Sequence, residues 1–187
     1  MYLIGLAVRS CYSYGVDRKW AEMADMTTTR SASVSVPIPG GIWVSGGYNS
    51  GYKTLETTEM IFLNKTKKIG KPLPRARLGH CMVNYGEKIF STGGRDRDYV
   101  STTNVWQFET GYNFVNVDGP MMKKTRNYHA CGIIHSTLHD SRPILVVAGS
   151  WAGGSGAKSS EYWDFTLAGS TWQLCSKSSM FSFIIYH

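Results

Sequence analysis

The feature that most constrains the fold is a set of landmarks that recurs in constant order along the chain. Each of three units opens on an arginine that precedes a glycine-containing doublet: Arg30 before Gly46-Gly47, Arg77 before Gly93-Gly94, and Arg126 before Ala148-Gly149. The spacing is 16 residues in the first two units and 22 in the third, where the insertion HSTLHDSRP accounts for the excess. The doublets recur after 47 and 55 residues. Self-similarity at such a period predicts a repeated structural unit.

A seven-residue segment follows each doublet and aligns between the units without a gap. The segments are TTEMIFL at 57–63, TTNVWQF at 102–108 and SSEYWDF at 159–165. Residues two apart on a strand share a face. The pattern therefore pairs large apolar side chains on one face: Tyr12 with Tyr14, Ile61 with Leu63, Trp106 with Phe108, and Trp163 with Phe165. A last apolar segment ends each unit, at Trp20, Ile69, Val115 and Trp172. Four short strands per unit are expected.

A repeat of about 50 residues with a glycine doublet and a spaced aromatic pair resembles the kelch repeat, which forms one four-stranded blade of a β-propeller. The resemblance covers nearly the whole chain. It implies an all-β fold in a single domain, with a partial blade at 1–26 and complete blades at 30–73, 77–121 and 126–175. The chain departs from the family at Ile69 and Val115, where tryptophan is usual, and at Ala148.

The two ends of the chain leave two arrangements open. Tyr2 to Leu6 falls where a second strand is due, Ser10 to Val16 is a third strand and Lys19 to Met26 a fourth, so the chain starts inside a blade. The tail at 180–186 falls where a first strand is due. It either closes a four-bladed ring by pairing with Tyr2 to Leu6, or the chain is a fragment of a larger propeller. The fragment is favoured, because kelch propellers usually have more blades.

Composition agrees with a globular, turn-rich all-β protein, since 42% of the 187 residues are apolar and 20 are glycine. No apolar stretch is long enough to span a bilayer. The N-terminal MYLIGLAV lacks a basic region and a cleavage site, so a strand is preferred to a signal peptide. The compartment stays open, with the cytoplasm favoured.

Cysteine and histidine give little indication of chemistry. The four cysteines lie on separate expected strands and are interpreted as buried thiols rather than disulfides: Cys11, Cys81, Cys131 and Cys175. His129 and Cys131 share a strand face but no second pair completes a metal site, and His135 and His139 fall in a hairpin insertion. We expect no metal and no cofactor.

Two short motifs have limited meaning by themselves. Asn64-Lys65-Thr66 is a glycosylation sequon, which matters physically only if the chain is secreted. The stretch that follows Gly149 looks like a phosphate loop, but Ala157 separates Gly156 from Lys158 and a strand follows, so nucleotide binding is not expected.

No catalytic set emerges with credible spacing, so the chain is not expected to be an enzyme. The propeller of galactose oxidase resembles kelch repeats, which makes a galactose-oxidase-like enzyme the alternative, but no Tyr, His and Cys ligands for copper can be placed here. Nucleic acid is a third class. The net charge of +7 permits it, yet no recognition helix or RNA-binding signature supports it.

The loops predict an interaction surface. In a four-stranded antiparallel blade, the loop between the second and third strands and the link to the next blade leave from the same face. These loops contain half of the chain's 20 basic residues: Lys53, Lys71, Arg75, Arg77, Arg95, Arg97, Lys123, Lys124, Arg126 and Lys158. Arg77 and Arg126 are expected to be structural, through hydrogen bonds to neighbouring loops. The candidate binding residues are Arg75, Arg95, Arg97, Lys123, Tyr48, Tyr52, Tyr99, Tyr128 and Trp151.

Arginine and aromatic side chains together are typical of binding hot spots, and the positive net charge points to an acidic partner. The kelch resemblance implies protein binding, often as the substrate-recognition part of a ubiquitin ligase or as a cytoskeletal adaptor. We therefore expect a non-catalytic interaction module that binds an acidic peptide or loop of a protein partner, with no nucleic acid and no membrane.

Overall fold

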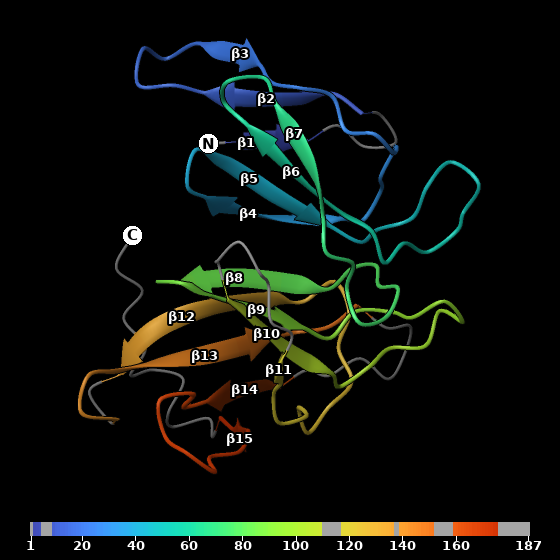
Figure 1. Ribbon diagram of the computed structural model, residues 1–187. Helices are drawn as coiled ribbons and strands as arrows, with labels where there is room; N and C mark the ends of the chain where they lie inside the picture. Colours follow the sequence, from blue (N-terminus) through green and yellow to red (C-terminus); the bar gives the residue numbers. More distant parts are fainter. Residues whose placement is uncertain (1, 5–8, 110–116, 137–138, 152–158, 176–187) are drawn as a thin grey trace. The chain divides into compact units, whose positions relative to one another are not determined.

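The computed structural model describes residues 2–4, 9–109, 117–136, 139–151 and 159–175 of the chain (Figure 1). Within these residues the secondary-structure elements are fifteen β-strands in four antiparallel sheets, and none is an α-helix. A helix long and apolar enough to cross a membrane is likewise not found among them. The chain divides into two compact units, 1–79 with 95–100 and 80–94 with 101–187.

The first unit contains two sheets in which each strand pairs with the next along the chain. The three-stranded sheet is formed by β1 (Tyr2–Ile4), β2 (Cys11–Tyr14) and β3 (Trp20–Glu22). The four-stranded sheet is formed by β4 (Val34–Ile38), β5 (Gly41–Ser45), β6 (Thr58–Phe62) and β7 (Lys67–Gly70). Both sheets fall within the intervals 1–26 and 30–73 that the repeat marks out.

The second unit contains two four-stranded sheets of the same order. One is formed by β8 (Cys81–Tyr85), β9 (Lys88–Thr92), β10 (Val105–Glu109) and β11 (Val117–Asp118). The other is formed by β12 (Ala130–Ser136), β13 (Arg142–Ala148), β14 (Ser160–Trp163) and β15 (Gln173–Leu174). The expected strand position at Val115 and the expected closing strand at 180–186 lie outside the described residues.

Each unit has an apolar core in which the third strand of a repeat takes part. In the first unit the cluster is Cys11, Met23, Met26, Ile42, Val44 and Ile61. In the second unit it is Phe90, Val105, Met122, Leu145, Val147, Trp163 and Trp172. The pairing of Ile61 with Leu63 on one face of the third strand is wrong, because β6 ends at Phe62 and Leu63 enters the turn with 53% of its surface exposed. Ile69 is also exposed, whereas Trp172 is fully buried.

The glycine doublets bring the backbone of one repeat against that of the next. The Gly47 amide donates to the carbonyl of Arg77 at 2.8 Å, and the Gly94 amide donates to that of Arg126 at 2.7 Å. Gly47 has a φ of +87°, and a Cβ there would lie 2.5 Å from the Ser31 carbonyl oxygen. Only glycine fits such a close approach, which explains the glycine at the second position of the doublet.

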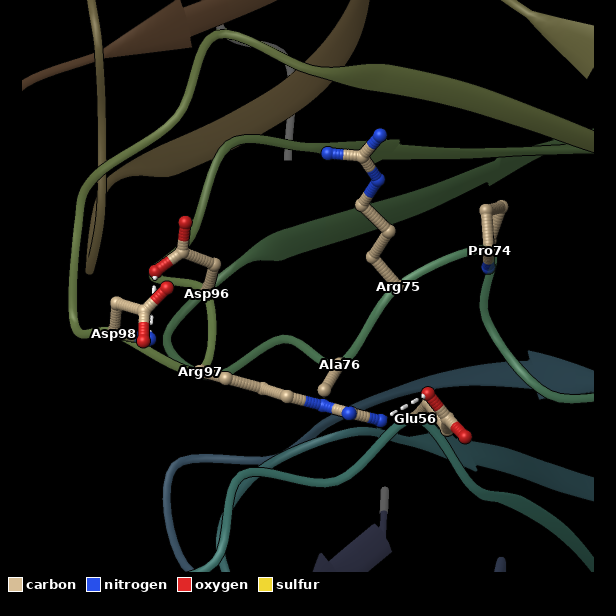
Figure 2. Close-up of a pocket in the computed structure, with 7 residues that line it drawn as sticks. All are labelled: Glu56, Pro74, Arg75, Ala76, Asp96, Arg97 and Asp98. Atoms are coloured by element: carbon tan, nitrogen blue, oxygen red, sulfur yellow. Dashed lines mark hydrogen bonds and ion pairs between the residues drawn. The ribbon is translucent and has the colours of Figure 1, made fainter.

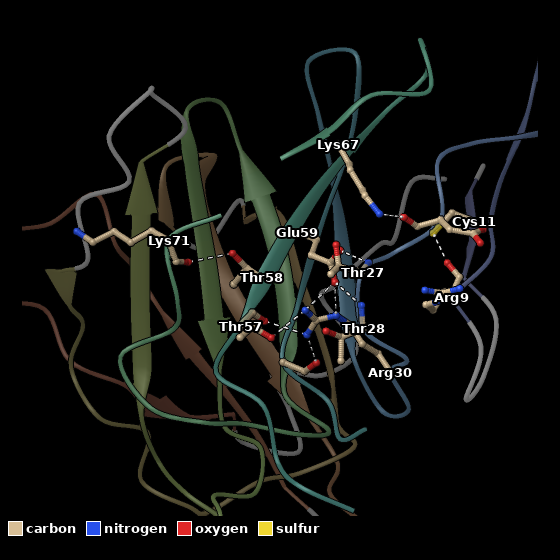
Figure 3. A network of polar contacts seen from close by, with 12 residues as sticks. Arg9, Cys11, Thr27, Thr28, Arg30, Thr57, Thr58, Glu59, Lys67 and Lys71 are labelled. Atoms are coloured by element: carbon tan, nitrogen blue, oxygen red, sulfur yellow. Dashed lines mark hydrogen bonds and ion pairs between the residues drawn. The ribbon is translucent and has the colours of Figure 1, made fainter. Parts of the chain in front are cut away.

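A buried arginine holds the loops of the second sheet together (Figure 3). Arg30 is almost fully buried, and its Nη1 donates to the carbonyls of Gly46 and Thr57 at 2.8 and 2.9 Å. Its Nη2 donates to Glu59 Oε1 at 3.0 Å. Glu59 in turn accepts from the backbone amide of Thr27 at 2.5 Å. The guanidinium and the carboxylate therefore form hydrogen bonds with backbone groups of two loops and with each other.

The fourth sheet has the same arrangement, except that Arg126 binds the carbonyl of the second residue of its doublet, Gly149, where Arg30 binds that of the first, Gly46. Arg126 donates to the carbonyls of Gly149 and Ser159 at 2.7 and 2.6 Å, and to Glu161 Oε1 at 2.9 Å. Glu161 accepts from the backbone amide of Lys123 at 2.6 Å. The structural role expected for Arg126 is thereby confirmed. The sequence signal for the pair is the glutamate at the third position of the aligned seven-residue segment.

The cysteine assignment from sequence is wrong for two of the four residues. Cys81 and Cys131 form a disulfide with their Cα atoms 5.9 Å apart. Each lies near the start of the first strand of its repeat, β8 and β12, so the bond joins the two sheets of the second unit. A cross-link spanning 50 residues stabilises a fold by about 4 kcal/mol in the chain-entropy model.

The other two cysteines are free thiols. Cys11 is buried as expected, and burial raises its pKa to about 11. Cys175 is half-buried and follows β15, so it does not lie on a strand as the repeat predicts. The disulfide also weakens the preference for the cytoplasm, where disulfides are rare.

The buried pair of Arg30 and Glu59 predicts a large mutational cost. Burial alone would raise the pKa of Glu59, but the hydrogen bond from Thr27 and the charge of Arg30 outweigh it, so the pKa is lowered. We expect Glu59→Gln to lower the free energy of unfolding by about 3–5 kcal/mol, because it leaves a buried guanidinium without its carboxylate. The measurement is urea denaturation followed by tryptophan fluorescence.

Glu56→Gln is the matched control, because Glu56 also pairs with an arginine but at the surface. It should cost less than about 1 kcal/mol. Equal losses in the two variants would contradict the importance of the buried pair.

The same pair predicts a pH dependence. Since the carboxylate form of Glu59 is the stabilising one, its contribution to the free energy of unfolding is present above about pH 4.3 and is lost as the pH falls through the lowered pKa.

His129 predicts a second pH dependence. Its Nε2 lies 2.8 Å from Thr92 Oγ1, and burial together with the charge of Arg126 lowers its pKa to about 4. The unfolded chain binds this proton near pH 6.5, so the contribution of neutral His129 is complete above that pH and is lost towards pH 4. Between pH 7 and pH 4.5 we expect a loss of about 2 kcal/mol. Denaturation curves of the His129→Gln variant should lack this component, and an unchanged pH profile would contradict the assignment.

Candidate functional site

A polar pocket of about 350 Å³ lies in the first unit, where three loops meet (Figure 2). One loop joins β5 to β6, the second links β7 to β8, and the third is the 95–100 segment between β9 and β10. The pocket is lined by Glu56, Pro74, Arg75, Ala76, Asp96, Arg97 and Asp98. Loops of the two kinds expected to leave from one face thus contribute to one cavity.

One of the two arginines of the pocket has a partner within it. The Nη2 of Arg97 lies 2.7 Å from Glu56 Oε2, and the two side chains are 63% and 44% exposed. An exposed pair of this kind contributes little stability, on the order of 0–1 kcal/mol. Its effect is to hold the Arg97 guanidinium toward the β5–β6 loop, beside an opposite charge.

Arg75 is the cation of the pocket that carries no such partner. It is exposed, and no hydrogen bond or ion pair of its side chain is found among the described residues. Figure 2 shows its guanidinium extending away from the pair formed by Arg97 and Glu56. The charge of Arg75 also contributes to lowering the pKa of the buried Arg77, although burial is the main cause of that shift. Arg75 is therefore the group best placed to meet an incoming anion.

The loops of the pocket share a turn that is built on an amide or carboxylate side chain. The Oδ1 of Asn49 accepts from the backbone amides of Gly51 and Lys53, both at 3.0 Å. The Oδ1 of Asp96 accepts from those of Asp98 and Val100, at 3.0 and 2.9 Å. Such turns tie the loops down without regular secondary structure.

The third residue after each of these turn-forming side chains is an exposed tyrosine in left-handed backbone. Tyr52 has a φ of 57° and Tyr99 a φ of 60°, and they are 74% and 48% exposed. The Tyr99 hydroxyl donates to the Tyr52 carbonyl at 3.0 Å, and the Tyr52 ring stacks on that of Tyr48 at 5.9 Å. A bulky residue in this conformation costs about 1–2 kcal/mol, which glycine would avoid. The strain is not offset by burial of the rings, which stay accessible from solvent.

The nine candidate binding residues are divided between the two units. Six belong to the first unit: Tyr48, Tyr52, Arg75, Arg95, Arg97 and Tyr99. Three belong to the second: Lys123, Tyr128 and Trp151. In the second unit the rings of Tyr128 and Trp151 meet edge to face at 6.0 Å, and both are exposed. Lys123 is exposed, while its backbone amide is bound to Glu161.

Arg95 does not have the free loop position expected from the sequence. Its backbone pairs with Leu78 in both directions, at 2.8 and 3.0 Å, and its side chain is half-buried. It therefore serves the structure of the loop, and Arg75 with Arg97 are the arginines that line the pocket. Glu56 was missed by sequence reasoning, because it lies 41 residues from Arg97 and belongs to no repeated landmark.

The residues weighed for metal binding have other partners. Cys131 is in the disulfide, and the His139 ring packs on Tyr162 at 5.1 Å. Within the part of the chain that the structure describes, no group of three or more His, Cys, Asp or Glu side chains is placed to hold a metal ion.

No protein-family model matches the chain, and no curated protein matches it. Among solved structures, the chain is similar to the one described as "Structure of YjhT", with a TM-score of 0.72 and 16% sequence identity. The similarity covers 94% of this chain and 61% of that chain, so this chain spans less than two thirds of the length of its neighbour. At this identity the two proteins share a fold, and nothing follows about activity.

Proposed function

We propose that the chain forms part or all of a kelch-type β-propeller and acts as a non-catalytic protein-interaction module. The sheets of three, four, four and four strands support this proposal, since they match one partial and three complete blades. The shared fold with the YjhT structure is compatible with it. The observation that carries the function is the pocket in which Arg75 lies without a partner among loops that also carry strained, exposed tyrosines.

The partner chemistry follows from the charges of the pocket. A carboxylate of an acidic peptide or loop would meet Arg75 and form charge-assisted, bidentate hydrogen bonds with its guanidinium. Arg97 is less available, because an incoming carboxylate has to compete with Glu56 at 2.7 Å. Asp96 and Asp98 repel a second acidic group on their side of the pocket. A partner segment with one carboxylate at Arg75 therefore fits better than a run of many acids.

The tyrosines would supply the apolar part of the contact. Tyr52 and Tyr99 belong to the loops that line the pocket, and their rings are rigid and amphipathic, which suits hot-spot residues. The left-handed backbone of the two tyrosines costs free energy that glycine would not cost. Contacts between the rings and a partner, which glycine could not make, would offset this cost. Exposed tyrosines in strained backbone beside the pocket support a binding surface over a merely solvated one.

Charge removal at Arg75 tests the site. We expect Arg75→Ala to weaken binding of a labelled Glu-containing peptide about tenfold or more, whereas Arg97→Ala has a smaller effect because Glu56 already occupies it. Binding measured by fluorescence anisotropy should also fall as salt rises.

Lys65→Ala is the matched control, since it removes one exposed charge in the β6–β7 turn, at the other end of the sheet. An equal loss for Arg75→Ala and Lys65→Ala would mean that diffuse charge attracts the peptide, and the proposed site would be wrong.

A comparison of Tyr52→Gly with Tyr52→Ala tests the role of the strained ring. Both remove the ring, but only glycine relaxes the left-handed backbone, so we expect Tyr52→Gly to be more stable than Tyr52→Ala by up to about 1 kcal/mol. Both variants should weaken peptide binding alike. If the Gly variant is as stable as the parent but binds normally, Tyr52 has no part in the interaction.

A further inference from the structure

The turn between β6 and β7 presents a sequon that the interaction site does not use. The Lys65 amide donates to the Phe62 carbonyl at 3.1 Å, and the Phe62 amide donates to the Thr66 carbonyl at 2.9 Å. Lys65 has a φ of 63°, as the last residue of a three-residue hairpin loop requires. Asn64 is therefore the middle residue of the loop, and Asn64, Lys65 and Thr66 are all exposed.

The side chains of the sequon are arranged with the amide nitrogen available. The Asn64 Oδ1 accepts from the Thr66 hydroxyl at 2.6 Å and from the Thr66 amide at 3.1 Å. Both contacts use the oxygen, and within the described residues the Asn64 Nδ2 has no hydrogen-bond partner. The hydroxyl two residues on thus lies beside the amide, and the nitrogen belongs to an exposed side chain that is bonded only through its oxygen.

The disulfide supplies an independent observation about the compartment. Disulfides form and persist in oxidising compartments and are rare in the cytosol, and Cys81 is bonded to Cys131. In eukaryotic cells the oxidising compartment of protein folding is also the one in which Asn-x-Thr sequons are glycosylated. A sequon is not glycosylated in a cytosolic chain, but it can be glycosylated in a chain that folds where disulfides form.

We propose that Asn64 is an N-glycan attachment site that is used when the chain folds in an oxidising secretory compartment. In the transfer, Asn64 Nδ2 attacks the anomeric carbon of an oligosaccharide linked through pyrophosphate to a lipid. A nitrogen–carbon bond forms, the bond from the anomeric carbon to the phosphate oxygen breaks, the lipid pyrophosphate leaves, and the amide proton passes to a base. No electrons are exchanged.

The position of the turn makes a permanent glycan compatible with the rest of the first unit. In an antiparallel sheet successive connections alternate between the two ends, so the β6–β7 turn lies opposite the β5–β6 and β7–β8 connections. Those two connections line the polar pocket. A glycan at Asn64 would stand beside the exposed Leu63 and leave the pocket open. The inference does not depend on the proposed function.

The experiment directs the full chain into the endoplasmic reticulum of cultured animal cells with a cleavable signal sequence. The secreted chain is examined by gel mobility and peptide mass mapping before and after treatment with peptide-N-glycosidase F. We expect one glycan on the parent chain, mapped to Asn64, and none on Asn64→Gln or Thr66→Ala. Thr66→Ser keeps the hydroxyl and should keep the glycan, which separates loss of the sequon from loss of folding.

Thiol labelling of the same material gives a second readout. Without reductant, Cys81 and Cys131 should resist a maleimide, and both should react after reduction and unfolding. The proposal is overturned if the secreted parent chain shows no glycosidase-sensitive shift, or if the shift persists in Asn64→Gln. Reactive Cys81 and Cys131 in the unreduced secreted chain would equally overturn it, because the compartment argument rests on their bond.

Discussion

The structure depends above all on an arginine buried together with a glutamate. Taking both charges out of water is costly, and the arrangement is stable only because every strong donor and acceptor finds a partner. Arg30 binds two loop carbonyls and Glu59, and Glu59 binds the backbone amide of Thr27. The guanidinium is planar and offers its donors in a fixed fork, so the loops have one way to meet it. Arg126 and Glu161 impose the same geometry on the fourth sheet. The constant order of arginine, glycine-containing doublet and glutamate in these two repeats follows from this requirement.

The repeat that opens on Arg77 differs at the position of the glutamate. Asn104 stands where Glu59 and Glu161 stand in the other repeats, so the arginine of that repeat, Arg77, has no carboxylate at this sequence position. Burial lowers the pKa of Arg77 to about 10, and the negative charge of Asp96 opposes the shift. Asp96 also ties down the 95–100 segment through its turn. The loop that lines the pocket therefore also stabilises a buried charge, and changes to that loop affect both.

Periodicity predicted the features that each repeat contains and missed those that join repeats. The strand order, the arginine positions and the meeting of two kinds of loop followed from one aligned pattern. The bond between Cys81 and Cys131 did not, because an alignment says that two first strands are equivalent and not that they lie side by side. The pair of Glu56 with Arg97 was missed for the same reason, since neither residue recurs. The backbone bridge between Arg95 and Leu78 was also not predicted, because the alignment marks the residue after a glycine doublet only as part of a loop.

The hydrogen bonds of the glycine doublets bear on how such a chain can be lengthened or shortened. Because the Gly47 amide donates to Arg77 and the Gly94 amide to Arg126, a repeat cut at its own borders leaves a donor without its acceptor. The smallest interval that satisfies its own backbone begins in one repeat and ends in the next. A duplication that extends the array would preserve these bonds only when it copies a full period in register, whichever residue it starts from. A duplication whose length is not a whole number of repeats would leave glycine amides unpaired where the copied segment meets the original chain.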